Sequence, residues 1–221
     1  MFNKKTFNNQ RYSVHHLGMP DEKRVSLILE LAGSNKKILD VGCCDGYIGS
    51  LLMKQNNIVY GTDISTVCVK NSIKNGIKAK VLDIEKDKIP FETKFDVITA
   101  GEIIEHVVDT DGFLTKMSNA LKIGGTLIIT TPNLAALGRR LLLLAGKNPH
   151  MEVSYENYSA GHVRYFIKDT LKWLLEKNGF KVETILSDTV NFNASGSLNS
   201  KTLAYLFPTL GKTLIAKCTK L

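Results

Sequence analysis

The chain has 221 residues, of which 43% are hydrophobic and 23% are charged. This length and composition are typical of one folded α/β domain and exclude a largely disordered chain. The net charge of +8 comes from lysines and arginines spread along the chain in runs of no more than two, so a localised nucleic-acid-binding patch is not indicated.

Strand-like and helix-like segments alternate along most of the chain. Strands are predicted at 36–42, 57–63, 77–83, 95–101, 126–132, 180–188 and 211–220. Helices are predicted at about 21–33, 47–55, 65–75, 110–121 and 168–178. This alternation predicts a doubly wound, Rossmann-like α/β fold with a seven-stranded, mostly parallel sheet and helices on both faces. The last strand is predicted to be antiparallel, because the segment before it lacks clear helical content.

We predict one domain over residues 1–221, with an N-terminal helical cap at 1–33. Residues 133–166 form a long insertion before the last helix and are predicted to be a lid or acceptor-binding segment. Its segment LAALGRRLLLLAGK has two interpretations. Its thin polar face favours a lid helix packed on the domain, and the alternative is a helix lying on a membrane surface.

The compartment is predicted from the N-terminus and the cysteines. Residues 1–16 are polar and basic and lack the apolar segment of a secretory signal. No apolar run is long enough to span a bilayer. The four cysteines contain no C-x-x-C pair, and adjacent Cys43 and Cys44 are badly placed to form a bridge or to chelate zinc. We therefore expect a cytoplasmic protein with reduced thiols.

The segment ILDVGCCDGYIG, residues 38–49, places a glycine-rich loop directly after the first strand. Gly42 and Gly46 allow the backbone to approach a ligand, and Gly49 allows the next helix to pack closely on the sheet. A dinucleotide-binding loop would have the spacing G-x-G-x-x-G, whereas the spacing here is G-x-x-x-G-x-x-G. This difference disfavours NAD.

An aspartate lies at the end of each of the first three strands, where doubly wound sheets bind ligands. Asp40 can accept a hydrogen bond from a ligand ammonium group, Asp63 from the hydroxyls of a ribose, and Asp83 from an adenine amine. These three ligand groups are those of S-adenosylmethionine. The alternative for each aspartate is a helix cap or a loop contact.

The sequence resembles the class I S-adenosylmethionine-dependent methyltransferases over roughly residues 10–188, through the motifs ILDVGCCDGYIG, YGTDIS, VLDIE, FDVITAGEIIEHV, LKIGGTLIITTPN and GHVRYFIKDTLKWLLEKNGFKV. The resemblance implies S-adenosyl-L-methionine as cofactor and S-adenosyl-L-homocysteine as product. It implies a cofactor site formed by Asp40, Gly42, Gly46, Asp63, Ile64, Asp83 and Ile84. Cys44 stands where the family usually has glycine, so this departure bears on the affinity for the cofactor.

The segment after the fourth strand, GEIIEHVVDTDGF, carries candidate catalytic residues. In a helical turn over 102–106, the side chains of Glu102, Glu105 and His106 would share one face. His106 is then a candidate general base. Alternatively, these three residues and His162 hold a divalent metal ion, a pattern that resembles RNA 3′-terminal 2′-O-methyltransferases and ubiquinone-pathway O-methyltransferases. A third interpretation gives the segment a purely structural role.

Two classes of nucleic-acid methyltransferase are disfavoured, because the chain lacks an Asn/Asp-Pro-Pro-aromatic motif and a Pro-Cys motif. The segments TPN and GHVRYF resemble the branch that acts on small molecules and glycans. We predict O-methylation of a small metabolite, glycan or lipid-linked precursor, with peripheral membrane contact left open. The alternatives are a metal-assisted RNA 2′-O-methyltransferase and a non-catalytic cofactor-binding or regulatory protein. The residues predicted to line the acceptor pocket are Tyr155, Tyr158, His162, Arg164 and Tyr165.

Overall fold

The computed structural model describes Thr6, Asn9 and residues 21–153, 161–193 and 197–221. Most of the predicted N-terminal cap before residue 21, together with Tyr155 and Tyr158, lies outside the described residues. The larger helices are α2 (Glu22–Ala32), α3 (Tyr47–Met53), α4 (Thr66–Lys74), α5 (Thr110–Ala120), α6 (Leu137–Leu144) and α7 (Lys168–Lys177). The strands of the main sheet are β1 (Lys37–Val41), β2 (Ile58–Asp63), β3 (Lys78–Val81), β4 (Phe95–Gly101), β5 (Leu121–Pro132), β6 (Phe180–Ser187) and β9 (Thr213–Lys220).

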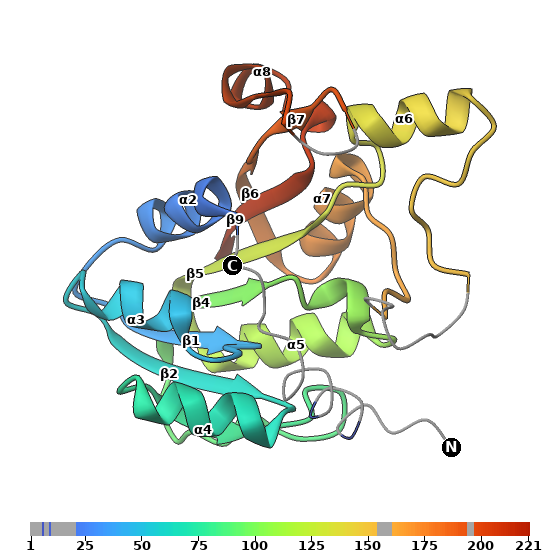
Figure 1. Cartoon of the computed structure of the whole chain (residues 1–221). Helices are drawn as coiled ribbons and strands as arrows, with labels where there is room; N and C mark the ends of the chain where they lie inside the picture. The colour runs from blue at the N-terminus through green and yellow to red at the C-terminus, as the bar shows by residue number, and fades with distance from the viewer. Residues whose placement is uncertain (1–5, 7–8, 10–20, 154–160, 194–196) are drawn as a thin grey trace.

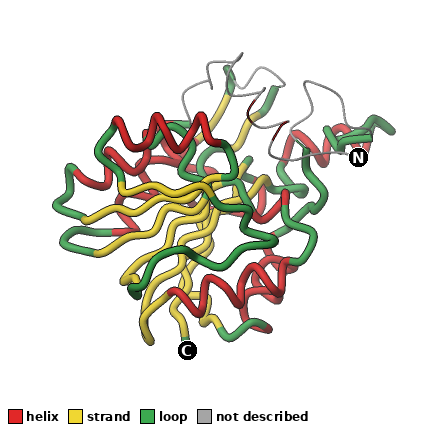
Figure 2. The backbone as a smooth tube through the Cα atoms, turned by 90° about the horizontal axis from the view of Figure 1, so that it is seen from below, coloured by secondary structure: helices red, strands yellow, loops and turns green. Residues whose placement is uncertain are grey.

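The seven strands form one sheet in the order β3-β2-β1-β4-β5-β9-β6. The first five of these strands in the sheet pair in parallel, whereas β9 is antiparallel to both of its neighbours, β5 and β6. The predicted doubly wound, mostly parallel sheet with an antiparallel last strand is therefore confirmed. Figure 2 shows helices on both sides of the sheet.

Successive side chains of the central strands enter different hydrophobic cores, because side chains alternate between the two faces of a sheet. Ile38 of β1 packs in the core beneath α2, α3 and α4, and the next residue, Leu39, packs in the core beneath α5 and α7. Both side chains are fully buried. This two-sided burial explains why the strands read as nearly continuous apolar runs in the sequence.

The strands that follow β1 in the chain lie first on one side of it, as β2 and β3, and then on the other side, as β4 and β5. β1 pairs with β2 on one side and with β4 on the other, so the strand order reverses there. In a doubly wound sheet, ligands bind at the carboxyl ends of the strands at this reversal. The glycine-rich loop after β1 and the segment after β4 both start at this edge.

Three small elements, followed by a 3-10 turn at Pro208–Leu210, lie between β6 and β9. The two-residue strands β7 (Val190–Asn191) and β8 (Asn199–Ser200) pair with each other, and the short helix α8 (Lys201–Leu206) follows directly. In Figure 1, α6, β7 and α8 lie together at the top of the molecule. None of the described helices is both long enough and apolar enough to cross a membrane.

Candidate functional site

The loop after β1 is held against the end of β2 by backbone hydrogen bonds. The amides of Gly42 and Cys43 both donate to the carbonyl of Thr62, at 2.7 and 3.0 Å. Gly42 has a φ of 75°, and a β-carbon there would overlap the side chain of Ile103. Gly46 has a φ of 85° and directly precedes α3. Both positions require glycine, as the sequence predicted for a loop that approaches a ligand.

The carboxylate of Asp63 accepts hydrogen bonds from backbone amides on both sides of the site. Its Oδ2 atom accepts the amide of Cys44 at 3.0 Å and its Oδ1 atom accepts the amide of Ser65 at 2.8 Å. Only 8% of the residue is exposed, and this burial raises the pKa of the carboxyl group. The backbone of Ile64 also contacts this carboxylate, and a carboxylate offers about four acceptor positions, so it can still accept a hydrogen bond from a ligand hydroxyl.

Asp40 lies beside Asp63 at the end of the neighbouring strand. Its Oδ1 atom accepts the hydroxyl of Thr99 at 2.8 Å. Burial raises the pKa of Asp40 to about 7, and the negative charge of Asp63 contributes to the increase. The structure therefore brings two of the three predicted strand-end carboxylates together in one buried region.

The third predicted carboxylate, Asp83, is engaged in its own turn. Its side chain accepts the amide of Glu85 at 3.1 Å and pairs with Lys86 at 3.1 Å. Ile84 and Ile64, the apolar residues predicted at the cofactor site, are both half-buried. Asp83 thus forms a loop contact, which was the alternative to binding a ligand. The end of β3 is held next to Asp63 by the amide of Leu82, which donates to the Asp63 carbonyl.

The segment after β4 differs from the predicted helical turn. A short 3-10 helix covers Ile104–His106, and Glu102 before it has a φ of 57°. The hydroxyls of Thr130 and Thr131 donate to Glu102 and Glu105, at 2.9 and 3.0 Å respectively. Glu102 therefore lies outside the helical turn that carries Glu105 and His106, and the turn predicted over 102–106 begins two residues later. The two glutamates remain close enough for the charge of Glu102 to raise the pKa of Glu105.

Glu105, His106 and His162 do come together, and their potential ligand atoms all lie within 4.8 Å of one another. The rings of His106 and His162 are 4.9 Å apart between centroids. His106 Nδ1 lies 3.0 Å from the carbonyl oxygen of Gly161, which can only accept a hydrogen bond. Nδ1 therefore carries the proton, and Nε2 is the basic nitrogen of His106.

Glu105 is the most buried member of this cluster, with 1% of the residue exposed. Burial, followed by the charge of Glu102, raises the pKa of Glu105 well above its usual range. Its Oε1 atom is buried without a hydrogen-bond partner among the described residues. A carboxylate oxygen without a partner next to two imidazoles fits a divalent metal site.

A pocket of about 830 Å³ opens at the same edge of the sheet, bordered by the start of α2, by α6 and by the start of β9. Glu102 and Pro132 line it from the ends of β4 and β5. Arg164 and Tyr165, predicted to line an acceptor pocket, are not among the residues that line this one. Arg164 donates to the Val108 carbonyl, and the Tyr165 hydroxyl accepts the amide of Glu152.

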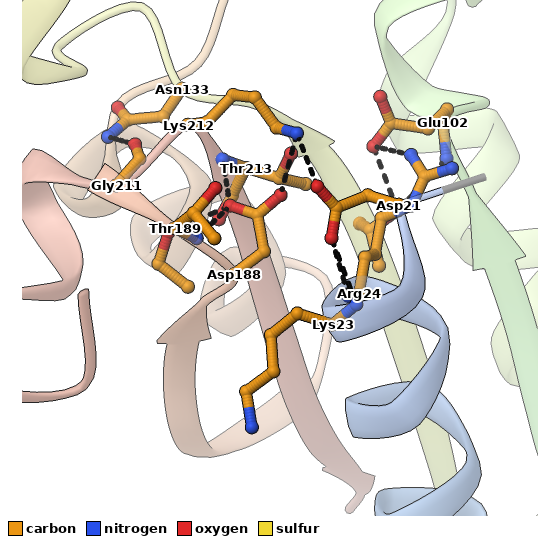
Figure 3. A network of polar contacts seen from close by, with 12 residues as sticks. Asp21, Lys23, Arg24, Glu102, Asn133, Asp188, Thr189, Gly211, Lys212 and Thr213 are labelled. Carbon is orange, nitrogen blue, oxygen red and sulfur yellow. Dashed lines mark hydrogen bonds and ion pairs between the residues drawn. The ribbon is translucent and has the colours of Figure 1, made fainter. Parts of the chain in front are cut away.

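A network of charged residues that was not predicted from the sequence lies at the wall of this pocket (Figure 3). Lys212 Nζ lies 2.7 Å from Asp21 and 3.4 Å from Asp188, which is fully buried. Asp21 also caps α2, and Arg24 pairs with Glu102 at 3.1 Å. The helix-capping pattern at Asp21 is visible in the sequence, but its pairing with a residue 191 positions away is not.

Comparisons with known proteins show which proteins the chain is similar to. A family model described as a methyltransferase domain matches residues 15–185. The chain is 29% identical to human mitochondrial ubiquinone biosynthesis O-methyltransferase over 164 residues, covering 70% of the chain and 44% of that protein. It is 31% identical to the Pasteurella multocida ubiquinone biosynthesis O-methyltransferase over 128 residues, covering 50% of the chain and 52% of that protein. The chain spans about half the length of these curated relatives.

Solved structures share the fold. A possible histamine N-methyltransferase from Thermotoga maritima superimposes with a TM-score of 0.67 at 17% identity, covering 90% of this chain and 88% of that chain. The magnesium protoporphyrin IX methyltransferase from Synechocystis, with bound S-adenosylhomocysteine, gives a TM-score of 0.62 at 14% identity, covering 100% of this chain and 96% of that chain. At these identities the likeness shows the fold alone.

Proposed function

Because the chain belongs to the family of methyltransferase domains, we propose that it transfers the methyl group of S-adenosyl-L-methionine to a hydroxyl oxygen of a small molecule. The membership confirms the predicted methyltransferase class at the level of the family. The observation that carries the proposal is the pair of buried carboxylates, Asp40 and Asp63, beside the glycine-rich loop at the carboxyl ends of β1 and β2.

In the proposed complex, Asp63 accepts hydrogen bonds from the ribose hydroxyls through its remaining acceptor positions. Gly42 and Gly46 allow the backbone to lie along the methionine part of the cofactor, and Asp40 lies near its ammonium group. Ile64 and Ile84 border the ribose and adenine. Asp83 acts through the turn that it stabilises, since its carboxylate is bound to Glu85 and Lys86.

The proposed reaction is an in-line displacement. A lone pair of the acceptor oxygen attacks the methyl carbon, the bond from carbon to sulfur breaks, and its electron pair remains on sulfur to give S-adenosyl-L-homocysteine. The proton of the acceptor hydroxyl passes to His106 Nε2, because Nδ1 already donates to Gly161. His162 and Glu105 lie next to this imidazole and orient it.

A divalent metal ion fits the same cluster. Glu105, His106 and His162 would hold it, with the unpartnered Oε1 atom of Glu105 as one ligand. When bound, such an ion lowers the pKa of an acceptor hydroxyl. Glu102 does not belong to this group of three, and its carboxylate pairs with Arg24 at 3.1 Å.

An oxygen acceptor is proposed because the curated relatives are named O-methyltransferases of ubiquinone biosynthesis. A small acceptor is favoured over RNA because the site is flanked by a pocket of about 830 Å³. We also propose a reducing compartment, the cytoplasm, because Cys43, Cys44, Cys68 and Cys218 are all free thiols.

A transfer assay with methyl-labelled S-adenosyl-L-methionine and a panel of phenols, catechols and sugar alcohols tests the proposal. Label is expected in at least one methyl ether. His106→Ala is expected to lower its formation by about 100-fold, with S-adenosylhomocysteine affinity unchanged. Lys172→Ala, on the exposed face of α7, serves as the control. Cofactor binding without transfer to any hydroxyl in the panel would contradict the proposal and favour a non-catalytic protein.

A further inference from the structure

The pocket of about 830 Å³ is lined by leucines and by charged side chains. We infer that it binds the methyl acceptor and that this acceptor is an amphipathic anion, with an apolar body and a carboxylate, sulfonate or phosphate group that pairs with Arg139. The inference rests on the proposed methyltransferase activity, because it names the substrate class for that activity.

The pocket lies within reach of the proposed cofactor site. Glu102, at the end of β4, lines the pocket, and the next residue, Ile103, packs directly against Gly42 in the loop after β1. Pro132, at the end of β5, lines the pocket as well. Glu102 and Ile103, two consecutive residues, therefore connect the pocket lining to the glycine-rich loop.

The apolar part of the lining comes mainly from α6. Leu137, Leu141 and Leu142 line the pocket from this helix, and Phe192 and Leu210 line it from the segments that follow β6. Leu137 and Leu141 are four residues apart and share one face of the helix, and Leu142 borders that face. This face would bury the apolar body of a ligand, in a pocket large enough for a small organic molecule.

The pocket lining contains more positively charged than negatively charged side chains. Four cations and two carboxylates line the pocket, and the carboxylates are already engaged, Glu102 with Arg24 and Asp21 with Lys212. Among the described residues, no carboxylate forms an ion pair with the other two cations, Arg139 and Lys147, although the charge of Glu102 acts on the guanidinium of Arg139.

Arg139 is the stronger candidate of these two cations. Its Nη1 atom is buried and has no hydrogen-bond partner among the described residues. Burial lowers the pKa of its guanidinium group, although the group stays charged. A buried donor without a partner is costly, and a guanidinium binds planar or tetrahedral anions through two hydrogen bonds. An anionic group of the ligand would satisfy this donor.

Two naphthalenediols that differ in one charge test the inference: 2,3-dihydroxynaphthalene-6-sulfonate and 2,3-dihydroxynaphthalene. Each is titrated calorimetrically into protein saturated with S-adenosylhomocysteine. We expect Arg139→Gln to weaken binding of the sulfonate by about tenfold and of the neutral diol by less than about twofold. Arg140→Gln is the matched control, because Arg140 is the exposed neighbour and does not line the pocket.

The outcomes separate this inference from the proposed function. Equal weakening of both diols by Arg139→Gln, or no weakening of either, would overturn the inference even where S-adenosylhomocysteine binds. Selective weakening of the sulfonate together with transfer of label to it, lowered in Arg139→Gln, supports the inference. Failure of the wild-type protein to bind S-adenosylhomocysteine would instead overturn the proposed function, and with it the identification of the pocket as an acceptor site.

Discussion

The backbone amide of Cys44 donates a 3.0 Å hydrogen bond to the carboxylate of Asp63, and this bond ties the loop after β1 to the end of β2. The side chain of Cys44 has no part in it. Its Sγ atom lies 3.7 Å from Sγ of Cys68 on α4, and its φ of 48° is one that glycine adopts more easily. The residue that departs from the family pattern is thus accommodated by α4.

Cys44→Gly is therefore expected to keep S-adenosylhomocysteine affinity within about twofold of wild type, since the amide that bonds to Asp63 remains. Cys44→Val is expected to lower the free energy of unfolding by about 1–2 kcal/mol, because a β-branched residue is strained at positive φ. Calorimetric titration and urea unfolding measure the two effects. Loss of cofactor binding in Cys44→Gly would show that the thiol itself takes part in the site.

Asp40 makes folding stability depend on pH. Its pKa is about 7 in the folded protein and near 3.8 when unfolded, so between these values the folded state binds more protons. The free energy of unfolding should then fall as pH rises from about 4 to 7, by up to about 1.4 kcal/mol per pH unit for this group. In Asp40→Asn, the free energy of unfolding, measured by urea unfolding without ligand, should fall less steeply as the pH rises. Equal slopes for the two proteins would contradict the burial-driven shift.

The ammonium group of Lys212 balances the charge of Asp188, which is fully buried. It pairs with Asp188 at 3.4 Å and with Asp21 at 2.7 Å, and its own side chain is 43% exposed. Lys212→Met should lower the free energy of unfolding by about 2 kcal/mol, because Asp188 would keep a buried charge without its cation. The double variant Lys212→Met/Asp188→Asn should recover most of this loss. An additive double variant would show that the pair is not coupled.

Divalent ions should stabilise the protein through the cluster of Glu105, His106 and His162. Mn²⁺ at about 100 times its dissociation constant adds about 2.7 kcal/mol to the free energy of unfolding, which raises the Tm by several degrees. His162→Asn should abolish the increase, and His150→Asn should keep it. An increase that persists in His162→Asn would place the ion elsewhere, and no increase in wild type would argue against a metal.

The sheet was predictable because most of its strands are short apolar runs in the sequence. Ile38 and Leu39 belong to an apolar run that ends at Gly42, and the structure places the two side chains in opposite cores. The antiparallel last strand followed from the absence of a helical crossover before it. The short helix α8 and strands β7 and β8 were missed, because elements of two to six residues carry too little periodicity.

The candidate site was predictable in part. Asp40 and Asp63 come together because parallel strands end at one edge of the sheet. Glu102 was misplaced because a positive φ at a glutamate leaves no sequence signal. The pairing of Asp21 with Lys212, and the pocket beside them, depend on packing between the start and the end of the chain. Local patterns contain no information about such contacts.

Calorimetric titration of S-adenosylhomocysteine into the wild-type protein and Asp63→Ala tests the central claim most directly. We expect micromolar affinity for wild type and a loss of at least about 1 kcal/mol, about fivefold, in Asp63→Ala, because the ribose diol loses a charged acceptor. Absence of binding by wild type would contradict the cofactor assignment. Unchanged affinity in Asp63→Ala would show that the ribose does not lie at Asp63.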